Sequence, residues 1–286
     1  NEKNERDDNK INVIISSGTG ISKKVSHVIT QKSFLENPDY VFDVFYNDTE
    51  KKSILKIEKD CTRLKDFIIK ETVHTGNIRK KLLLNSKINN SCKKLLRGKD
   101  CQRYFFTWNN MWLNLNYKIN NSKGEYATIP DAKFFNTPKI FLREIAENIT
   151  ACYDDENFYS LNKAYVIIPQ KKFMVKYVLG ILNSKLLAWY FRKKFYSAHI
   201  RGGYLQFKKQ YTSQIPIKNV GKTQQQQLVD FVDKIHSLQN DLKLALNEPD
   251  KKLKIIKEIQ MNEEKIDKLV YKLYGITPEE QKIFGL

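Results

Sequence analysis

The segment that decides the fold reads PKIFLREIAENITACYDD (138–155), LNKAYVIIPQKKFMVKYVLGILNSKLLAWYFRKKF (161–195) and RGGYLQFKKQYTSQIPI (201–217). Residues 139–142 and 149–153 have the apolar and β-branched content of paired strands, and the continuous apolar run 164–168 predicts a strand buried on both faces. Residues 173–196 predict one amphipathic helix with a basic last turn. The segment therefore predicts a compact scaffold that presents positive charge.

Outside this segment, the C-terminal part predicts two long helices. From Thr223 onward, apolar residues recur at heptad spacing up to Leu242, and after Pro249-Asp250 the spacing returns from Ile255 to Leu273. Two antiparallel helices of about 35 Å each would form a hairpin. Asn262 falls in the second seam, where it would either fix the register or face solvent. The expected fold class is α+β, with a twisted mixed β-sheet and packed helices followed by this hairpin.

The N-terminal part carries weaker signals. Residues 1–10 offer almost nothing apolar to bury, so we expect them to be disordered, and apolar positions between Lys51 and Lys70 follow a helical period. Asn37-Pro38-Asp39-Tyr40 is one residue short of the NPPY motif of adenine methyltransferases, and we interpret it as a turn before a strand. Because the chain begins at Asn1 instead of Met, we expect it to be part of a longer protein.

The charge balance indicates a polyanionic partner. Lys and Arg number 50 against 32 Asp and Glu, a net charge of +18 that is spread along the 286 residues. Nucleic acid is the first candidate and an anionic membrane surface the second. The alternative is a protein from an organism whose proteome is rich in Lys and Asn.

Catalytic and metal-binding signals are weak. Cys61, Cys92, Cys101 and Cys152 show no ligand spacing, so we expect reduced structural thiols and no metal site. Pro38-Asp39 with Glu50-Lys51-Lys52 matches a loose PD…ExK nuclease spacing that chance explains in so Lys-rich a chain. No residue is assigned a catalytic role. The sequence shows no signal peptide, and its most apolar helix is interrupted by polar residues, so we expect a cytoplasmic protein without membrane contact.

Basic clusters predict where a nucleic acid would bind. Cations followed by aromatic residues, as in KKLLRGKDCQRYFF (93–106), are typical of nucleic-acid surfaces, although the aromatic residues also suit an ordinary core. The cations in the last turn of the predicted helix complement its dipole, but His199, Arg201, Lys208 and Lys209 follow at once, and this exceeds what a dipole requires. The expected phosphate contacts are Lys93, Lys94, Arg97, Lys99, Arg103, Lys171, Lys172, Arg192, Lys193, Lys194 and Lys209.

Loop residues are the candidates for reading bases. Arg143 ends a predicted strand and would either contact a guanine or pair with Glu144 or Glu147. The second group surrounds the Gly202-Gly203 turn, where a flexible basic loop suits a contact with DNA. The candidates are Arg143, His199, Arg201, Tyr204 and Lys208.

The order of several motifs resembles the C-terminal specificity region of TaqI-like N6-adenine DNA methyltransferases, and the corresponding part of fused restriction-modification enzymes. The motifs are LLRGKDCQRY (95–104), PKIFLREI (138–145), ITACYDD (149–155), LNKAYVIIP (161–169), YVLGILNSKLLAWYF (177–191), QIPI (214–217) and IDKLVYKLYGITPEE (266–280). The likeness covers roughly residues 75–286. It implies a region that grips double-stranded DNA and reads its sequence, with Arg97, Lys99, Arg103, Arg143 and the loop of Arg201 at matching positions.

The same resemblance implies the rest of the organisation. The family's catalytic NPPY and cofactor loop are absent, so the chain is expected to be non-catalytic and to bind no cofactor. S-adenosylmethionine would belong to a catalytic domain of the parent chain. Residues 1–75 would be a linker or the tail of that domain, 76–220 the target-recognition domain, and 221–286 the hairpin, as spacer or dimerisation element. The alternatives are a half-length specificity subunit of a multisubunit complex and a complete metal-dependent nuclease.

Overall fold

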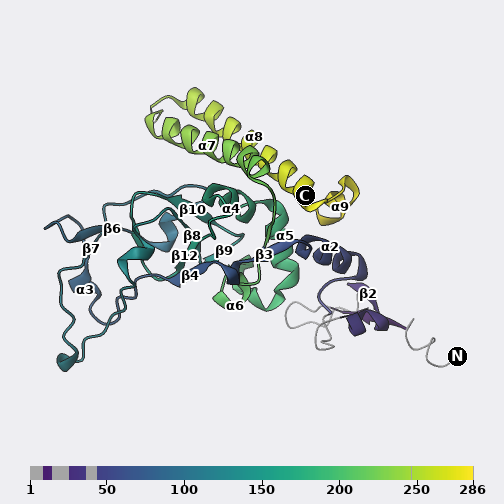
Figure 1. The fold of residues 1–286 in the computed structure, drawn as a ribbon, viewed down its shortest axis with the longest axis horizontal. Coiled ribbons are helices and arrows are strands. Elements are labelled where there is room, and N and C mark those ends of the chain that lie inside the picture. Colours follow the sequence, from purple (N-terminus) through teal and green to yellow (C-terminus); the bar gives the residue numbers. More distant parts are fainter. Residues whose placement is uncertain (1–8, 15–25, 37–43, 246, 286) are drawn as a thin grey trace.

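A four-stranded antiparallel sheet lies at the centre of the computed structural model, which describes residues 9–14, 26–36, 44–245 and 247–285. Lys139–Arg143 and Ala151–Asp154 pair as predicted, and the apolar run Ala164–Ile168 is the buried strand beside them. The order of the strands is β10 (Ala151–Asp154), β8 (Lys139–Arg143), β12 (Ala164–Ile168) and β4 (Ile68–Glu71) (Figure 1).

Both faces of this sheet are covered, which explains why its strands are almost wholly apolar. Ile140, Leu142 and Ile167 belong to the hydrophobic core formed with the helices. Their neighbours Phe141 and Val166 point to the opposite face and belong to a second core. The alternation follows from the two-residue period of a β-strand. The molecule therefore has a helical layer, a central sheet and a second β-layer, and an α+β fold, as the sequence predicts.

The second β-layer is a separate four-stranded sheet. Its strands, in order, are β11 (Tyr159–Ser160), β6 (Cys92–Leu96), β7 (Trp112–Asn114) and β5 (Leu83–Leu84). The pairing of β11 with β6 is parallel, whereas β7 pairs antiparallel with both β6 and β5. The described residues therefore form two four-stranded sheets and three two-stranded ones instead of the expected single mixed sheet, and of the two larger sheets only the second is mixed.

The predicted single helix over residues 173–196 is wrong, because two helices occupy it: α4 (Val175–Leu182) and α5 (Lys185–Lys194). The Asn183 side chain accepts a hydrogen bond from the Ala151 amide and donates one to its carbonyl, both at 3.0 Å. The Ser184 hydroxyl then accepts a bond from the Leu187 amide and caps α5. Asn183 thus extends the edge of the sheet, and the chain restarts as a new helix.

The predicted hairpin is formed by α7 (Lys222–Leu244) and α8 (Pro249–Tyr274), which lie side by side across the helical layer (Figure 1). Asn262 is buried and does not face solvent, and its side-chain amide donates a 2.7 Å hydrogen bond to the Glu258 carbonyl one turn back in its own helix. A last helix, α9 (Pro278–Phe284), follows Gly275 and returns to α5, where Phe284 stacks on Trp189 at 4.0 Å between ring centroids.

The first 75 residues contribute directly to this architecture. A small unit of β1 (Lys10–Val13), β2 (His27–Thr30) and η1 (Gln31–Glu36) has its own core. It is followed by α2 (Asp48–Glu58) and β3 (Cys61–Arg63). The helix expected over Lys51–Lys70 is therefore confirmed only in its first part. Since β4 is a strand of the central sheet, the segment before residue 75 is folded onto the expected recognition domain. Residues 37–40 lie outside the described part.

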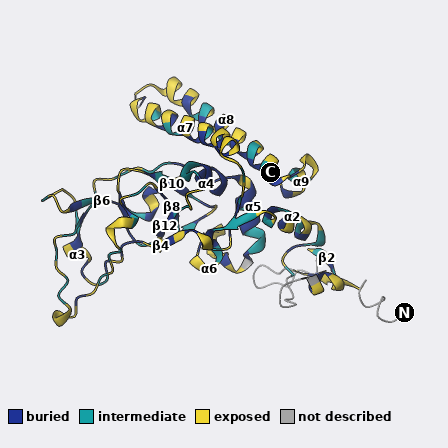
Figure 2. Cartoon of the chain, viewed as in Figure 1, coloured by how far each residue is buried: buried dark blue, intermediate teal, exposed yellow. Residues whose placement is uncertain are grey.

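Burial is densest where the layers meet, and the outer faces of α7 and α8 are exposed (Figure 2). The described residues include no helix that is both long and apolar enough to cross a membrane. Cys92, Cys101 and Cys152 are buried free thiols and Cys61 is partly buried, as expected of structural cysteines.

Candidate nucleic-acid interface

A groove with a volume of about 410 Å³ collects basic side chains from distant parts of the sequence. Its polar walls come from the start of α3 (Arg79–Leu82), from the loop of η4 (Gly98–Asp100), from the end of β8 and from the turn before β12. We call this surface the basic groove; it is lined by Arg79, Arg97, Gly98, Lys99, Arg143, Ile145, Leu161, Asn162 and Lys163.

Two lining residues are held by backbone geometry. Lys163 has a left-handed φ of 86°, a conformation that costs a non-glycine residue free energy and persists only where its surroundings enforce it. Its carbonyl accepts the Glu144 amide at 2.8 Å. A Cβ atom on Gly98 would lie 2.9 Å from that same carbonyl oxygen, so the 97–100 loop approaches the turn only because residue 98 is glycine.

Arg97 is a fixed cation at the rim of the groove. Its Nε and Nη2 atoms donate to both carboxylate oxygens of Asp100, at 2.6 to 3.1 Å, and the Asp100 carboxylate also accepts the Arg97 amide at 2.8 Å. The hydrogen bond to Asp100 raises the pKa of Arg97. Because this fork is occupied, Arg97 is suited to contacting one phosphate and not to a bidentate contact with a base.

Arg143 is differently placed, at the carboxyl end of the central strand β8. Its backbone pairs with Ala164 on one side and its amide donates to the Thr150 carbonyl on the other. In the described part of the chain its guanidinium has no carboxylate partner, since Glu144 binds Lys163 and Gln206 instead. Of the two roles considered for Arg143, pairing with Glu144 or Glu147 is therefore absent from the structure, and its guanidinium retains its bidentate geometry for an external acceptor.

The second group of base-reading candidates lies on a loop that is anchored beside the groove. The strand β13 (Leu205–Gln206) pairs with β9 (Ile145–Ala146), and Ile145 lines the groove. The turn η8 (Arg201–Gly203) closes the loop with two glycines at φ of 78° and 79°. His199, Arg201, Tyr204 and Lys208 are all exposed, and the His199 ring bonds the Arg192 carbonyl at 3.2 Å.

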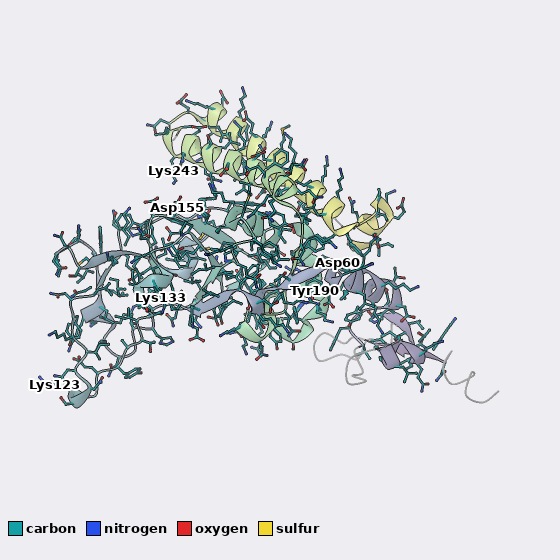
Figure 3. All side chains as sticks on the ribbon, viewed as in Figure 1. Asp60, Lys123, Lys133, Asp155, Tyr190 and Lys243 are labelled. Atoms are coloured by element: carbon teal, nitrogen blue, oxygen red, sulfur yellow. The ribbon has the colours of Figure 1, made fainter. Side chains whose placement is uncertain are left out.

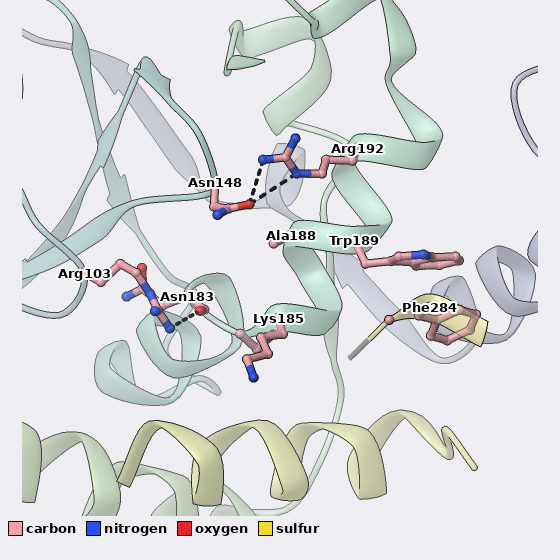
Figure 4. Close-up of a pocket in the computed structure, with 10 residues that line it drawn as sticks. Arg103, Asn148, Asn183, Lys185, Ala188, Trp189, Arg192 and Phe284 are labelled. Atoms are coloured by element: carbon pink, nitrogen blue, oxygen red, sulfur yellow. Dashed lines mark hydrogen bonds between the residues drawn. The ribbon is translucent and has the colours of Figure 1, made fainter. Parts of the chain in front are cut away.

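Two expected phosphate contacts occupy a different place, a pocket between the sheet and the helices (Figure 4). Arg192 donates to the Asn148 side chain at 3.0 and 3.2 Å and to the Glu147 carbonyl. Arg103 donates to the Asn183 carbonyl at 2.9 Å and forms an ion pair with Glu263 of α8 at 3.3 Å. We call this region the junction pocket; its walls also include Ser184, Lys185, Ala188, Trp189, Phe284 and Gly285.

Lys193 and Lys194 point to the N-terminal segment instead of an open surface. Lys193 pairs with Glu50 at 2.6 Å and Lys194 with Glu58 at 3.7 Å, both on α2. Glu58 also accepts a 2.6 Å hydrogen bond from the hydroxyl of Tyr190, which is labelled in Figure 3. Burial raises the pKa of Glu58, but Tyr190, Lys194 and Arg63 together hold it below its ordinary value. These lysines therefore attach α2 to α5.

The other expected phosphate contacts are dispersed. Lys94 pairs with Glu156 at 3.1 Å and covers the Trp108 and Phe158 rings. Lys172 donates to Thr62 and Asn219 at 3.1 and 3.2 Å. Three expected phosphate contacts form no ion pair with any described residue. Lys93 lies on β6, Lys171 lies before α4, and Lys209 begins α6 (Lys209–Thr212).

The basic groove also includes cations that sequence reasoning missed. Arg79 begins the short helix α3, in a run of basic residues that showed no other signal. Lys163 pairs with Glu144 at 3.5 Å but stays 58% exposed. The useful signal for Lys163 was its place in the turn directly before the buried strand 164–168, whose first residue, Ala164, pairs with Arg143.

Among the described residues, no three His, Cys, Asp or Glu side chains gather where they could hold a metal ion. The Asp39 of the nuclease-like spacing lies outside the described residues. Glu50, its proposed partner, is already engaged as the N3 residue of a capping box with Asn47 and as the ion-pair partner of Lys193.

No curated protein matches the chain. Among solved structures, it is similar to the type IIL restriction-modification enzyme MmeI in complex with DNA, with 14% identity, 74% of this chain and 34% of that chain covered, and a TM-score of 0.47. It is also similar to the type IIG restriction endonuclease BpuSI, with 12% identity, 79% of this chain and 33% of that chain covered, and a TM-score of 0.45. The HsdS subunit from Thermoanaerobacter tengcongensis shares 12% identity, with 80% of this chain and 52% of that chain covered, at a TM-score of 0.34.

The chain thus spans about a third of the length of MmeI and BpuSI. A family model gives the decisive match, over residues 93–217, and this range includes both central strands of the first sheet, helices α4 and α5 and every lining residue of the basic groove except Arg79. Residues 93–217 match the family model of the TaqI-like C-terminal specificity domain.

Proposed function

We propose that this chain is the sequence-reading module of a restriction-modification system and that the basic groove is its contact with double-stranded DNA. The observation that carries the proposal is the convergence of Arg79, Lys99, Arg143 and Lys163 on one groove of the specificity domain. Arg79, Lys99 and Arg143 have no carboxylate partner among the described residues, so their charge is available to an external anion.

The groove favours a division of labour between its cations. Lys99, Arg79, Lys163 and the clamped Arg97 would neutralise phosphates, which sets register and salt dependence without sequence preference. Arg143 would contact a base edge, with Arg201, Tyr204 and Lys208 approaching from the loop anchored on β9. This assignment moves Lys193, Lys194, Arg103 and Arg192 from the DNA contact to internal roles.

The parent protein would supply the chemistry. We propose that an S-adenosylmethionine-dependent adenine methyltransferase domain accompanies this module, and that the chain itself binds no cofactor. In such an arrangement the catalytic domain extrudes the target base while the specificity domain grips the duplex. The packing of α2 on α5 supports residues 44–75 as the physical link, because they are fixed to the specificity domain by the Glu50 and Glu58 ion pairs.

A half-length specificity subunit is the second candidate. Its support is the hairpin, whose outer side exposes 54% of Leu253 and 55% of Met261, a surface that a second copy would cover. A concentration-dependent change of mass in sedimentation, abolished by Leu253→Lys with Met261→Lys, is expected of this candidate. A monomer at all concentrations would exclude it.

The test of the proposed function is selection of the intact chain against random duplexes at two salt concentrations, followed by sequencing of the bound fraction. We expect an enriched short motif and binding that weakens with salt. Binding without enrichment would reject sequence reading, and the absence of any binding would reject the interface. Cleavage that requires a divalent metal would instead revive a nuclease.

A further inference from the structure

We infer that Glu144 is the positioning residue of the reading surface, which joins the Arg143 strand end, the Lys163 turn and the Arg201 loop into one rigid unit. The inference rests on the proposed function for its consequence in DNA reading, although its structural part stands by itself. Glu144 follows Arg143 directly and lies in none of the roles assigned above.

The backbone of Glu144 already joins the three segments. Its amide donates to the Lys163 carbonyl at 2.8 Å, and its carbonyl accepts the Phe207 amide at 2.7 Å. The first bond enforces the left-handed turn before β12, and the second fixes the end of β13 beside β9. Residue 144 is therefore the point where the two loops meet at the end of β8.

The carboxylate of Glu144 makes a second connection between the same segments. One oxygen accepts a hydrogen bond from the side-chain amide of Gln206 at 3.0 Å, and the other lies 3.5 Å from the Lys163 ammonium. The carboxylate is only 16% exposed, so both contacts are partly shielded from water. A single anion thus holds a groove lysine on one side and the root of the base-reading loop on the other.

The loop that precedes Gln206 is held mainly at its base. The bridge between His199 and the buried Leu205 closes it, the Ile200 amide donates to the Tyr204 carbonyl at 2.9 Å, and the His199 ring bonds the Arg192 carbonyl at 3.2 Å. Its tip holds Gly202 and Gly203, both in the left-handed region. The position of Arg201 relative to Arg143 is therefore transmitted through the β13 pairing, which the Glu144 side chain reinforces.

The carboxylate makes two contacts that substitution can separate. Glu144→Gln keeps an amide oxygen for Gln206 but loses the ion pair with Lys163, whereas Glu144→Ala loses both. Gln206→Ala removes only the loop contact from the opposite partner. Glu147, exposed directly after β9 and with a carboxylate that pairs with no described cation, supplies matched controls of equal charge change, Glu147→Ala and Glu147→Gln.

The first measurement is hydrogen exchange of the intact chain without DNA. We expect residues 199–207 to exchange about three- to tenfold faster in Glu144→Ala and in Gln206→Ala than in Glu147→Ala, with Glu144→Gln close to the unmodified chain. Equal exchange in Glu144→Ala and Glu147→Ala would overturn the positioning role. If Glu144→Ala does not fold, Gln206→Ala decides, since it leaves the Glu144 backbone bonds intact.

The second measurement is the duplex selection with the same variants. We expect Glu144→Ala to lower the enrichment of the motif about three- to tenfold while total binding is retained, and Glu144→Gln to restore most of it. An unchanged motif in Glu144→Ala alongside faster exchange would overturn the link to reading. Absence of DNA binding by the unmodified chain would instead reject the proposed function, and the exchange result would still decide the structural role.

Discussion

The basic groove and the junction pocket contain the same kinds of side chain in opposite circumstances. In the junction pocket, Arg103 and Arg192 are used up by internal acceptors, namely the Glu263 carboxylate, two backbone carbonyls and the Asn148 side chain. In the basic groove, Arg143 and Lys99 have no such partner among the described residues. A cation therefore indicates a binding surface only where it has no internal acceptor, and its place in a basic cluster of the sequence does not decide this.

The hairpin is attached by polar contacts of the same kind as those in the junction pocket. It is attached to the specificity domain by the Arg103–Glu263 pair, by His236 bonded to the Tyr104 carbonyl at 3.0 Å, and by Asp267 accepting the Lys185 amide at 2.8 Å. In the groove, Arg97 and Lys163 also have carboxylate partners, Asp100 and Glu144. Arg79, Lys99 and Arg143 have none among the described residues, and their charge is what the groove offers to a ligand.

The largest expected effect breaks the attachment of the hairpin. A Cβ on Gly180 would lie 2.0 Å from Leu228 Cδ2, so α4 and α7 touch at this point. Gly180→Val should lower the free energy of unfolding by about 3 kcal/mol, because the buried side chain must displace its neighbours. Denaturant unfolding measures this loss. Gly203→Val, which meets nothing within 4 Å, controls for a bulky residue at a glycine and should cost mainly its left-handed backbone.

A smaller effect is expected where α2 meets α5. Glu58→Gln should lower the free energy of unfolding by about 2 kcal/mol, since it leaves Arg63 and Lys194 without their shared carboxylate. Chemical denaturation near neutral pH measures this, with Glu279→Gln on the exposed start of α9 as the control. A loss no larger than that of the control would contradict the role of this network.

The pH dependence of the same pair follows from the pKa of Glu58. This pKa lies below the ordinary value of 4.5, so the ionised carboxylate stabilises the folded state above that pH, and the stabilisation is lost as the pH falls through the lowered pKa. The difference in unfolding free energy between the unmodified chain and Glu58→Gln should therefore shrink below pH 4.5. A difference that stays constant down to strongly acidic pH would contradict this account.

The next effect concerns discrimination between bases. Arg143→Ala should reduce the preference at one base position by about 1 to 2 kcal/mol and leave the unfolding free energy nearly unchanged, because its guanidinium has no partner to lose in the described structure. Competition binding with single-base variants of the selected motif measures it. Arg192→Ala is the matched control, and it should reduce stability without altering the preferred base.

The sequence predicted the elements better than their connections. The continuous apolar run 164–168 predicted a buried strand, and the heptad spacing of the C-terminal part predicted two packed helices, because each pattern reflects burial within the element itself. The break at Asn183 was hidden, because the reason for it is a tertiary bond to Ala151, a residue more than thirty positions away. The division into two sheets was hidden for the same reason, since pairings between distant strands leave no local pattern.

For the site, composition and the family motifs located the right positions but could not sort them. Arg97, Lys99 and Arg143 do meet in one groove, whereas Lys193 and Lys194 find partners on α2, which precedes them by more than 130 residues. A run of basic residues looks the same in the sequence whether or not the fold brings acidic side chains next to it. Only the fold reveals which cations are already neutralised.

The most direct test of the central claim compares two pairs of basic residues by the salt dependence of duplex binding. Arg79→Ala with Lys99→Ala, which removes two exposed groove cations without a carboxylate partner among the described residues, should reduce the slope of log affinity against log salt by about 2, roughly 0.9 for each phosphate that is no longer neutralised, without altering the unfolding free energy appreciably. Lys193→Ala with Lys194→Ala should leave the slope unchanged and lower stability. The reverse result, a reduced slope for Lys193 and Lys194 and an unchanged slope for the groove pair, would contradict the account.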